Sequence, residues 1–199
     1  VILMDRFDAE ESLRLIEQYS VTHSQWVPTM FVRMLKLPKE TRERYDLIQV
    51  SLLDSFAASA AGVYALNESY LYTVEAIREM LDRLEPGGAI AFTRWLKTPP
   101  RDMLKLFATL VAACEAEGIA DPGRRIAFIR SWNTGTLVLT ESPLSEEQIA
   151  AARAFREARG LDLCYLPGLA REDANRYTLL DSPVYFDFAA EALSGDREA

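Results

Sequence analysis

Short apolar segments alternate with longer amphipathic segments along most of this chain, and this alternation constrains its fold more than any other feature. The apolar runs at residues 47–53 and 89–95 predict buried strands, and the segments 73–84 and 101–117 carry apolar residues at helical spacing. Parallel neighbouring strands need a crossover connection, which is usually a helix. The pattern therefore predicts an α/β protein, a three-layer sandwich with a mainly parallel sheet.

A different connection is predicted near residue 135. Residues 126–132 and 136–140 read as two strands around Asn133-Thr134-Gly135, a sequence typical of a tight turn. They predict an antiparallel hairpin at one edge of the sheet. Three further elements are predicted after the hairpin, namely a helix at 146–159 with Ser145 and Gln148 as a capping box, a strand at 161–166 and a helix at 184–193.

The first 46 residues predict two shorter strand–helix units. The apolar runs at residues 1–4 and 21–27 read as strands. Asp8, followed by Glu11, reads as the N-terminal cap of a helix, because its carboxylate can accept free N–H groups of the first turn. A second helix is expected at 29–37, between two prolines.

Charge and length exclude several classes of protein. A chain of 199 residues suits one domain, or one domain plus a fragment. Proteins that bind nucleic acids neutralise phosphates with Lys and Arg, whereas this chain has a formal net charge of −8 and no basic stripe. No apolar run reaches the roughly 18 to 20 residues of a membrane span. We therefore expect neither a nucleic-acid partner nor a membrane span.

Cysteine and histidine are scarce. Two distant cysteines, Cys114 and Cys164, do not make a disulfide framework, so a reducing, cytoplasmic compartment is the expectation. A structural zinc site needs about four Cys or His ligands in paired spacing, and the chain has only one histidine, His23. No metal site is expected, and His23 is more readily explained as a structural residue than as a general base.

Most of the chain resembles one enzyme family. The residues concerned are Tyr-Asp-Leu-Ile-Gln-Val-Ser-Leu-Leu-Asp-Ser-Phe-Ala-Ala-Ser-Ala-Ala-Gly at 45–62, Leu-Tyr-Thr-Val-Glu-Ala at 71–76, Leu-Glu-Pro-Gly-Gly at 84–88 and Arg-Ser-Trp-Asn-Thr-Gly-Thr-Leu at 130–137. In order and spacing they resemble the spermidine-synthase-like branch of the S-adenosylmethionine-dependent transferases. The resemblance implies a Rossmann-like sheet in which the strand at 47–53 is the fourth.

The resemblance also implies where a substrate would bind. In such sheets ligands bind outside the carboxyl ends of the strands, and Asp54 ends the strand at 47–53. Relatives that transfer aminopropyl groups have an acidic residue there, so Asp54 is the catalytic candidate, to hold or deprotonate an attacking amine; alternatively it only caps a turn. Asn67, Glu68 and Tyr72 are candidates for binding the same substrate. The sequence Asp-Ser-Phe at 54–56 lacks the second acid and the proline of true spermidine synthases.

The cofactor half of that family has no counterpart in the sequence. The family binds S-adenosylmethionine or its decarboxylated form with a glycine-rich turn after the first strand and an acid after the second. None of the nine glycines makes such a turn; Gly87-Gly88 follows a helix and precedes a strand, and Gly87 is expected to end that helix. We therefore expect an incomplete Rossmann-like fold, no cofactor-binding residues and no cofactor for this chain alone.

The first quarter of the chain resembles a second family. Phe-Asp-Ala-Glu-Glu-Ser-Leu-Arg-Leu-Ile-Glu at 7–17 and Val-Thr-His-Ser-Gln-Trp-Val-Pro-Thr-Met-Phe at 21–31 resemble the adenylate-forming fatty acyl-CoA ligases. The family's nucleotide loop and its later ATP motifs are missing from these residues. The sequence thus predicts an acyl-CoA-ligase-like segment at 1–46 and the C-terminal half of a transferase domain at 47–199, joined near Tyr45-Asp46-Leu47.

Three functional hypotheses remain open from the sequence. The first is a transferase-type domain, for aminopropyl or methyl transfer to an amine, that is inactive alone because its cofactor half is missing. The second is a fragment of an ATP-dependent fatty acyl-CoA ligase. The third is a non-catalytic interaction protein, which self-associates or binds a partner through the edge of an incomplete sheet.

Overall fold

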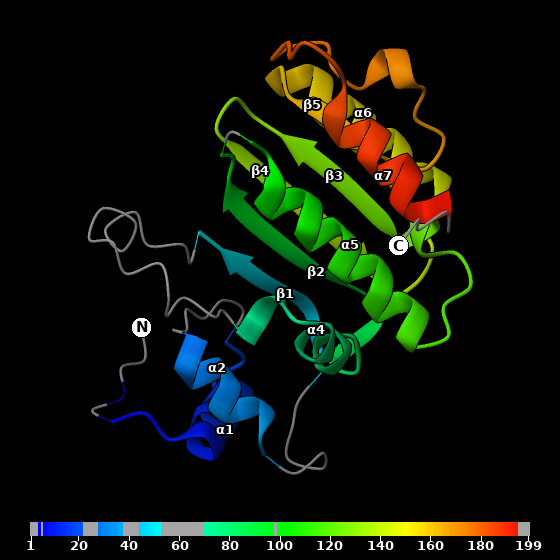
Figure 1. Ribbon diagram of the computed structural model, residues 1–199. Helices are drawn as coiled ribbons and strands as arrows, with labels where there is room; N and C mark the ends of the chain where they lie inside the picture. Colours follow the sequence, from blue (N-terminus) through cyan, green and yellow to red (C-terminus); the bar gives the residue numbers. More distant parts are fainter. Residues whose placement is uncertain are drawn as a thin grey trace. The chain divides into compact units, whose positions relative to one another are not determined.

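The computed structural model describes residues 4, 6–21, 28–37, 44–52, 70–97 and 99–194 (Figure 1). The chain divides into two compact units, Val1–Tyr45 and Asp46–Ala199. Each unit has its own buried apolar cluster, so each is considered by itself.

The first unit contains two helices, α1 (Ala9–Gln18) and α2 (Pro28–Leu35). Helix α1 begins as predicted, because the Glu11 N–H donates to the Asp8 carboxylate at 2.9 Å. The side chains buried between the helices are Ala9, Leu13 and Met34, with Phe7, Ile16, Leu37 and Tyr45 packed around them. The strands predicted at 1–4 and 21–27 lie outside the described residues, apart from Met4 and Val21.

The second unit contains a mixed five-stranded sheet in the order β1-β2-β4-β3-β5. Strands β1 and β2 are parallel, and the pairs β2–β4, β4–β3 and β3–β5 are antiparallel. The strands are β1 (Tyr45–Ser51), β2 (Leu84–Trp95), β3 (Ile126–Arg130), β4 (Thr134–Thr140) and β5 (Asp162–Tyr165).

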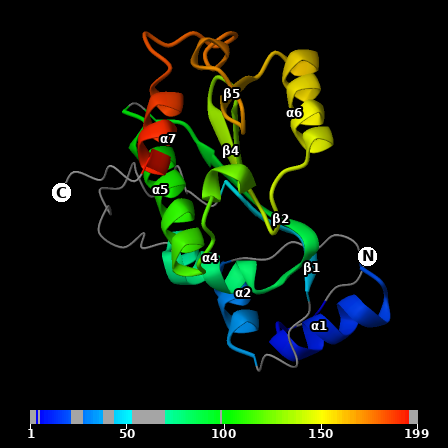
Figure 2. The same cartoon turned by 90° about the vertical axis from the view of Figure 1, so that its right-hand side faces the viewer.

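Helices cover both faces of this sheet. Figure 2 shows α5 and α7 on one side of the strands and α6 on the other. Helices α4 and α7 both contact α5. The bounds of the helices are α4 (Val74–Leu81), α5 (Arg101–Ala116), α6 (Glu146–Arg159) and α7 (Val184–Ser194), with short 3-10 turns at Tyr70–Tyr72, Pro122–Arg125 and Arg171–Asp173.

The prediction of a mainly parallel sheet is wrong for the described strands, and the hairpin explains why. Strands joined through a helix do run in the same direction, as the alternating pattern indicates: β1 with β2, β2 with β3, and β4 with β5. However, β4 inserts between β2 and β3, so all of its neighbours are antiparallel. The hairpin of β3 and β4 is antiparallel as predicted, but it lies inside the sheet, because β5 pairs with the outer side of β3.

Two local predictions also fail. Gly87 has a left-handed φ of 82°, but it lies within β2 and does not cap a helix, because α4 ends at Leu81. Strand β1 is not apolar on both faces: Ile48 and Val50 are buried, whereas Leu47 is exposed. A strand with one buried face alternates in this way.

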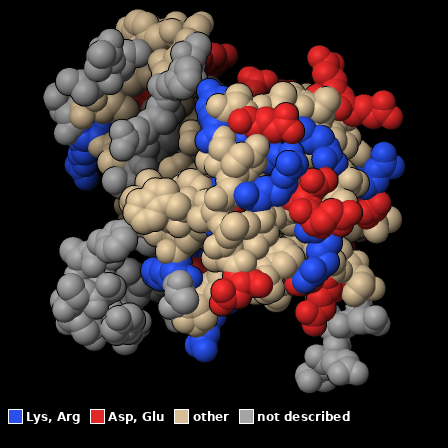
Figure 3. Space-filling view, turned by 90° about the horizontal axis from the view of Figure 1, so that it is seen from above, with Lys and Arg blue, Asp and Glu red and all other residues tan. Residues whose placement is uncertain are grey.

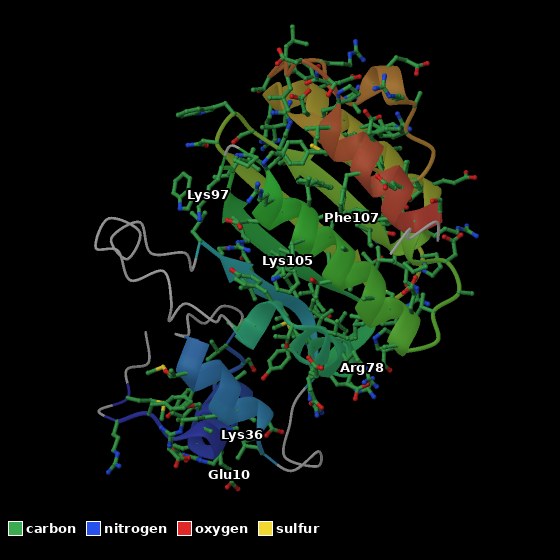
Figure 4. The ribbon with its side chains drawn as sticks, viewed as in Figure 1. Glu10, Lys36, Arg78, Lys97, Lys105 and Phe107 are labelled. Atoms are coloured by element: carbon green, nitrogen blue, oxygen red, sulfur yellow. The ribbon has the colours of Figure 1, made fainter. Side chains whose placement is uncertain are left out.

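The core of the second unit is aromatic and aliphatic. The largest side chains with no exposed surface include Phe92 from β2, Phe107 from α5 and Phe128 from β3. Phe107, labelled in Figure 4, packs in a T-shaped arrangement against Tyr165 from β5, with 5.6 Å between the ring centroids. The ring of Phe128 meets Tyr185 from α7 at 5.3 Å. These contacts tie the helices of one face to the sheet.

Candidate functional site at the carboxyl ends of the strands

The carboxyl ends of β1, β2 and β3 lie at one end of the sheet, which we call the carboxyl edge. The Leu52 N–H, just after β1, donates to the Thr93 carbonyl of β2 at 2.9 Å. The Leu96 N–H, just after β2, donates to the Asn133 carbonyl in the turn between β3 and β4 at 2.7 Å. These two hydrogen bonds bring the residue after β1, the end of β2 and the turn between β3 and β4 to the same end of the sheet.

Tyr72 is held at the carboxyl edge by an aromatic ring and a guanidinium. Its ring centroid lies 5.9 Å from that of Phe92. The guanidinium carbon of Arg94 lies over the Tyr72 ring, 4.5 Å from its centroid. A cation over the face of a tyrosine is attracted by the ring quadrupole, most strongly where water is excluded, and the Arg94 side chain is only 14% exposed. The arrangement fixes the orientation of Tyr72 relative to β2.

Arg94 also belongs to a charged cluster that joins β2 to α5. One Asp102 oxygen, in the first turn of α5, lies 3.1 Å from the Lys97 ammonium and 3.9 Å from the Arg94 guanidinium. Figure 4 shows Lys97 at the carboxyl edge and Arg78 at the other end of the unit. A carboxylate in the first turn is stabilised by the positive end of the helix dipole. The cluster therefore links the first turn of α5 to the end of β2.

The turn between β3 and β4 is fixed by the hydroxyl group of Ser131. The Ser131 oxygen accepts the N–H groups of Asn133 at 3.3 Å and Thr134 at 3.1 Å, and it lies 2.9 Å from the Thr134 hydroxyl. The Ser131 N–H donates to the Thr134 carbonyl at 2.8 Å. Within this braced turn the Trp132 side chain is 77% exposed. The hydrogen-bonded turn thus exposes a large aromatic side chain to solvent.

A buried ion pair holds the loop that follows the 3-10 turn η4 (Arg171–Asp173) against the same edge. Arg130, the last residue of β3, lies 3.0 Å from the Asp162 carboxylate, and their side chains are 2% and 0% exposed. The remaining Asp162 lone pairs accept the backbone N–H groups of Arg176, Tyr177 and Thr178 at 2.7 to 2.9 Å. Because its charge is paired and its lone pairs are used, this carboxylate is structural.

The structure describes one of the four residues that the sequence predicts for the site. Tyr72 lies against Phe92 and Arg94 near the carboxyl end of β2. Asp54, Asn67 and Glu68 lie outside the described residues. Sequence reasoning missed Arg94, Lys97 and Trp132. The signal that could have identified them is their position at or just after the carboxyl end of a predicted strand, because ligands of such sheets bind at the carboxyl ends of the strands.

Both cysteines of the second unit are buried. Burial raises the pKa of the Cys114 thiol to about 11 and raises the pKa of the Cys164 thiol still further. A thiol reacts as its thiolate, so both cysteines are expected to be unreactive at neutral pH. Burial likewise raises the pKa of Tyr165 to about 12.

Other kinds of site find no support in the described part of the chain. No group of three or more His, Cys, Asp or Glu side chains there is placed to hold a metal ion. None of the helices described is long and apolar enough to cross a membrane. On the face seen in Figure 3, acidic and basic side chains of the described residues are interspersed. Interspersed charge differs from the basic stripe that nucleic-acid binding needs.

The chain matches no protein-family model, and no curated protein matches it significantly.

Proposed function

We propose that residues 46–199 form the acceptor-substrate half of a Rossmann-like, spermidine-synthase-like transferase domain, with an amine acceptor bound at the carboxyl edge. The observation that carries this proposal is the meeting of three separate segments at that edge. They are the end of β1 at Leu52, the 3-10 turn with Tyr72, and the β3–β4 turn, which is bonded to the end of β2. Each of these segments belongs to a stretch that resembles the transferase family.

The connection between β1 and β2 supports the same proposal. These two parallel strands, with α4 before β2, form one crossover unit of the kind from which Rossmann-like sheets are built. In such units ligands bind outside the carboxyl ends of the strands. Under this proposal Asp54, two positions after Leu52 in the sequence, holds or deprotonates the attacking amine, and Tyr72 contacts the acceptor. Asn67 and Glu68 remain candidates for the same role.

The proposal assigns no cofactor-binding residues to this chain. In the family the transferred group comes from S-adenosylmethionine or its decarboxylated form, held by a glycine-rich turn that follows a strand. The glycines of this sequence do not form that motif. We therefore propose that this chain alone binds an amine but carries out little or no transfer.

Calorimetric titration tests the two parts of the proposal separately. We expect saturable 1:1 binding of at least one primary amine from a panel that includes putrescine, 1,6-diaminohexane and hexylamine. We expect no binding of S-adenosylmethionine at micromolar concentration. Asp54→Asn should weaken the amine at least about tenfold, as expected on loss of a charge-assisted hydrogen bond. The matched control Asp46→Asn removes an exposed carboxylate from the beginning of β1 and should leave binding unchanged.

A different result would contradict each of these two claims, amine binding and the lack of a cofactor site. Saturation by S-adenosylmethionine at a 1:1 ratio would overturn the claim that this chain lacks a cofactor site. Absence of binding for every amine in the panel would overturn the claim of an acceptor site.

A further inference from the structure

We draw no further inference here: the strongest candidate, the side-chain cluster at the carboxyl end of β2 in which the Arg94 guanidinium lies over the Tyr72 ring and near the Asp102 carboxylate, belongs to the site already described.

Discussion

At the scale of single residues, the Asp162 carboxylate connects the end of β3 to the loop at residues 176–178. It pairs with Arg130, whose side chain is buried as well, and it accepts three consecutive backbone N–H groups of residues 176–178. Removing one member of such a pair leaves the other charge buried without compensation. The position of the loop with Leu179 and Leu180 therefore depends on a side chain that the sequence alone does not single out.

The variant Asp162→Ala should lower the free energy of unfolding by about 3–5 kcal/mol, because Arg130 would keep a buried, uncompensated charge. Urea denaturation followed by circular dichroism measures this change. Asp187→Ala is the control, since it breaks an exposed ion pair with Arg171 and should have little effect. A loss for Asp162→Ala no larger than that of the control would show that the buried pair does not hold the loop.

Alkaline pH should destabilise the second unit through Tyr165. Burial raises the pKa of Tyr165 to about 12, above the value of about 10 in an unfolded chain. Above pH 10 the unfolded state therefore binds fewer protons than the folded state, so the stability contribution of the neutral phenol is lost as pH rises from 10 to 12. Urea denaturation at pH 9, 10, 11 and 12 should show this decrease, and Tyr165→Phe should make it smaller. Equal pH dependence in both proteins would contradict the assignment.

At the scale of elements, local signals predict the beginnings of helices better than they predict the ends of helices or the neighbours of strands. Helix α6 has the predicted capping box: the Gln148 N–H donates to the Ser145 hydroxyl at 3.2 Å and the Ser145 N–H to the Gln148 side chain at 2.9 Å. Both bonds join residues three positions apart, so the sequence contains all of the necessary information. The prediction that Gly87 ends the helix is wrong: α4 ends at Leu81, and Gly87 adopts its positive φ inside β2. A glycine can adopt this conformation in a strand as well as after a helix.

Ser145→Ala should therefore destabilise the protein by about 1 kcal/mol, the usual cost of losing an N-terminal cap. Thermal denaturation followed by circular dichroism detects this as a lower Tm. Ser145→Asp keeps an acceptor oxygen at the same position and should restore most of the loss. If Ser145→Asp is as unstable as Ser145→Ala, the hydrogen bond to the Gln148 N–H is not the cause.

At the scale of the whole molecule, the sequence predicts the class of the fold but not the order of its strands. The alternation of strands and helices gives the direction of each strand joined through a helix, because such connections are crossovers. It does not say which strand inserts between two others. Strand β4 pairs with both β2 and β3, and this placement depends on contacts between residues far apart in sequence. Arg94, Lys97 and Trp132 are missed for the same reason, since the strands that carry or precede them are brought side by side only by these pairings.

The packing of α5 on the sheet should dominate the stability of the second unit. Phe107 has no exposed surface, and its ring contacts Tyr165 of β5. Phe107→Ala should cost about 3–5 kcal/mol, from lost burial and the cavity left behind. Lys105→Ala, an exposed position on the same helix (Figure 4), is the control and should change stability little. Similar urea midpoints for the two variants would contradict the position of Phe107 in the core.

The most direct test of the account is a residue-resolved nuclear magnetic resonance titration of the ¹⁵N-labelled chain with hexylamine. An acceptor site at the carboxyl edge predicts that amide shifts concentrate there, in residues 93–97, 130–135 and 176–181. It predicts little change at the opposite end of the sheet, in residues 118–126 and 139–142. Saturable shifts that concentrate at that opposite end, or that spread evenly over the second unit, would contradict an acceptor site at the carboxyl ends of β1, β2 and β3.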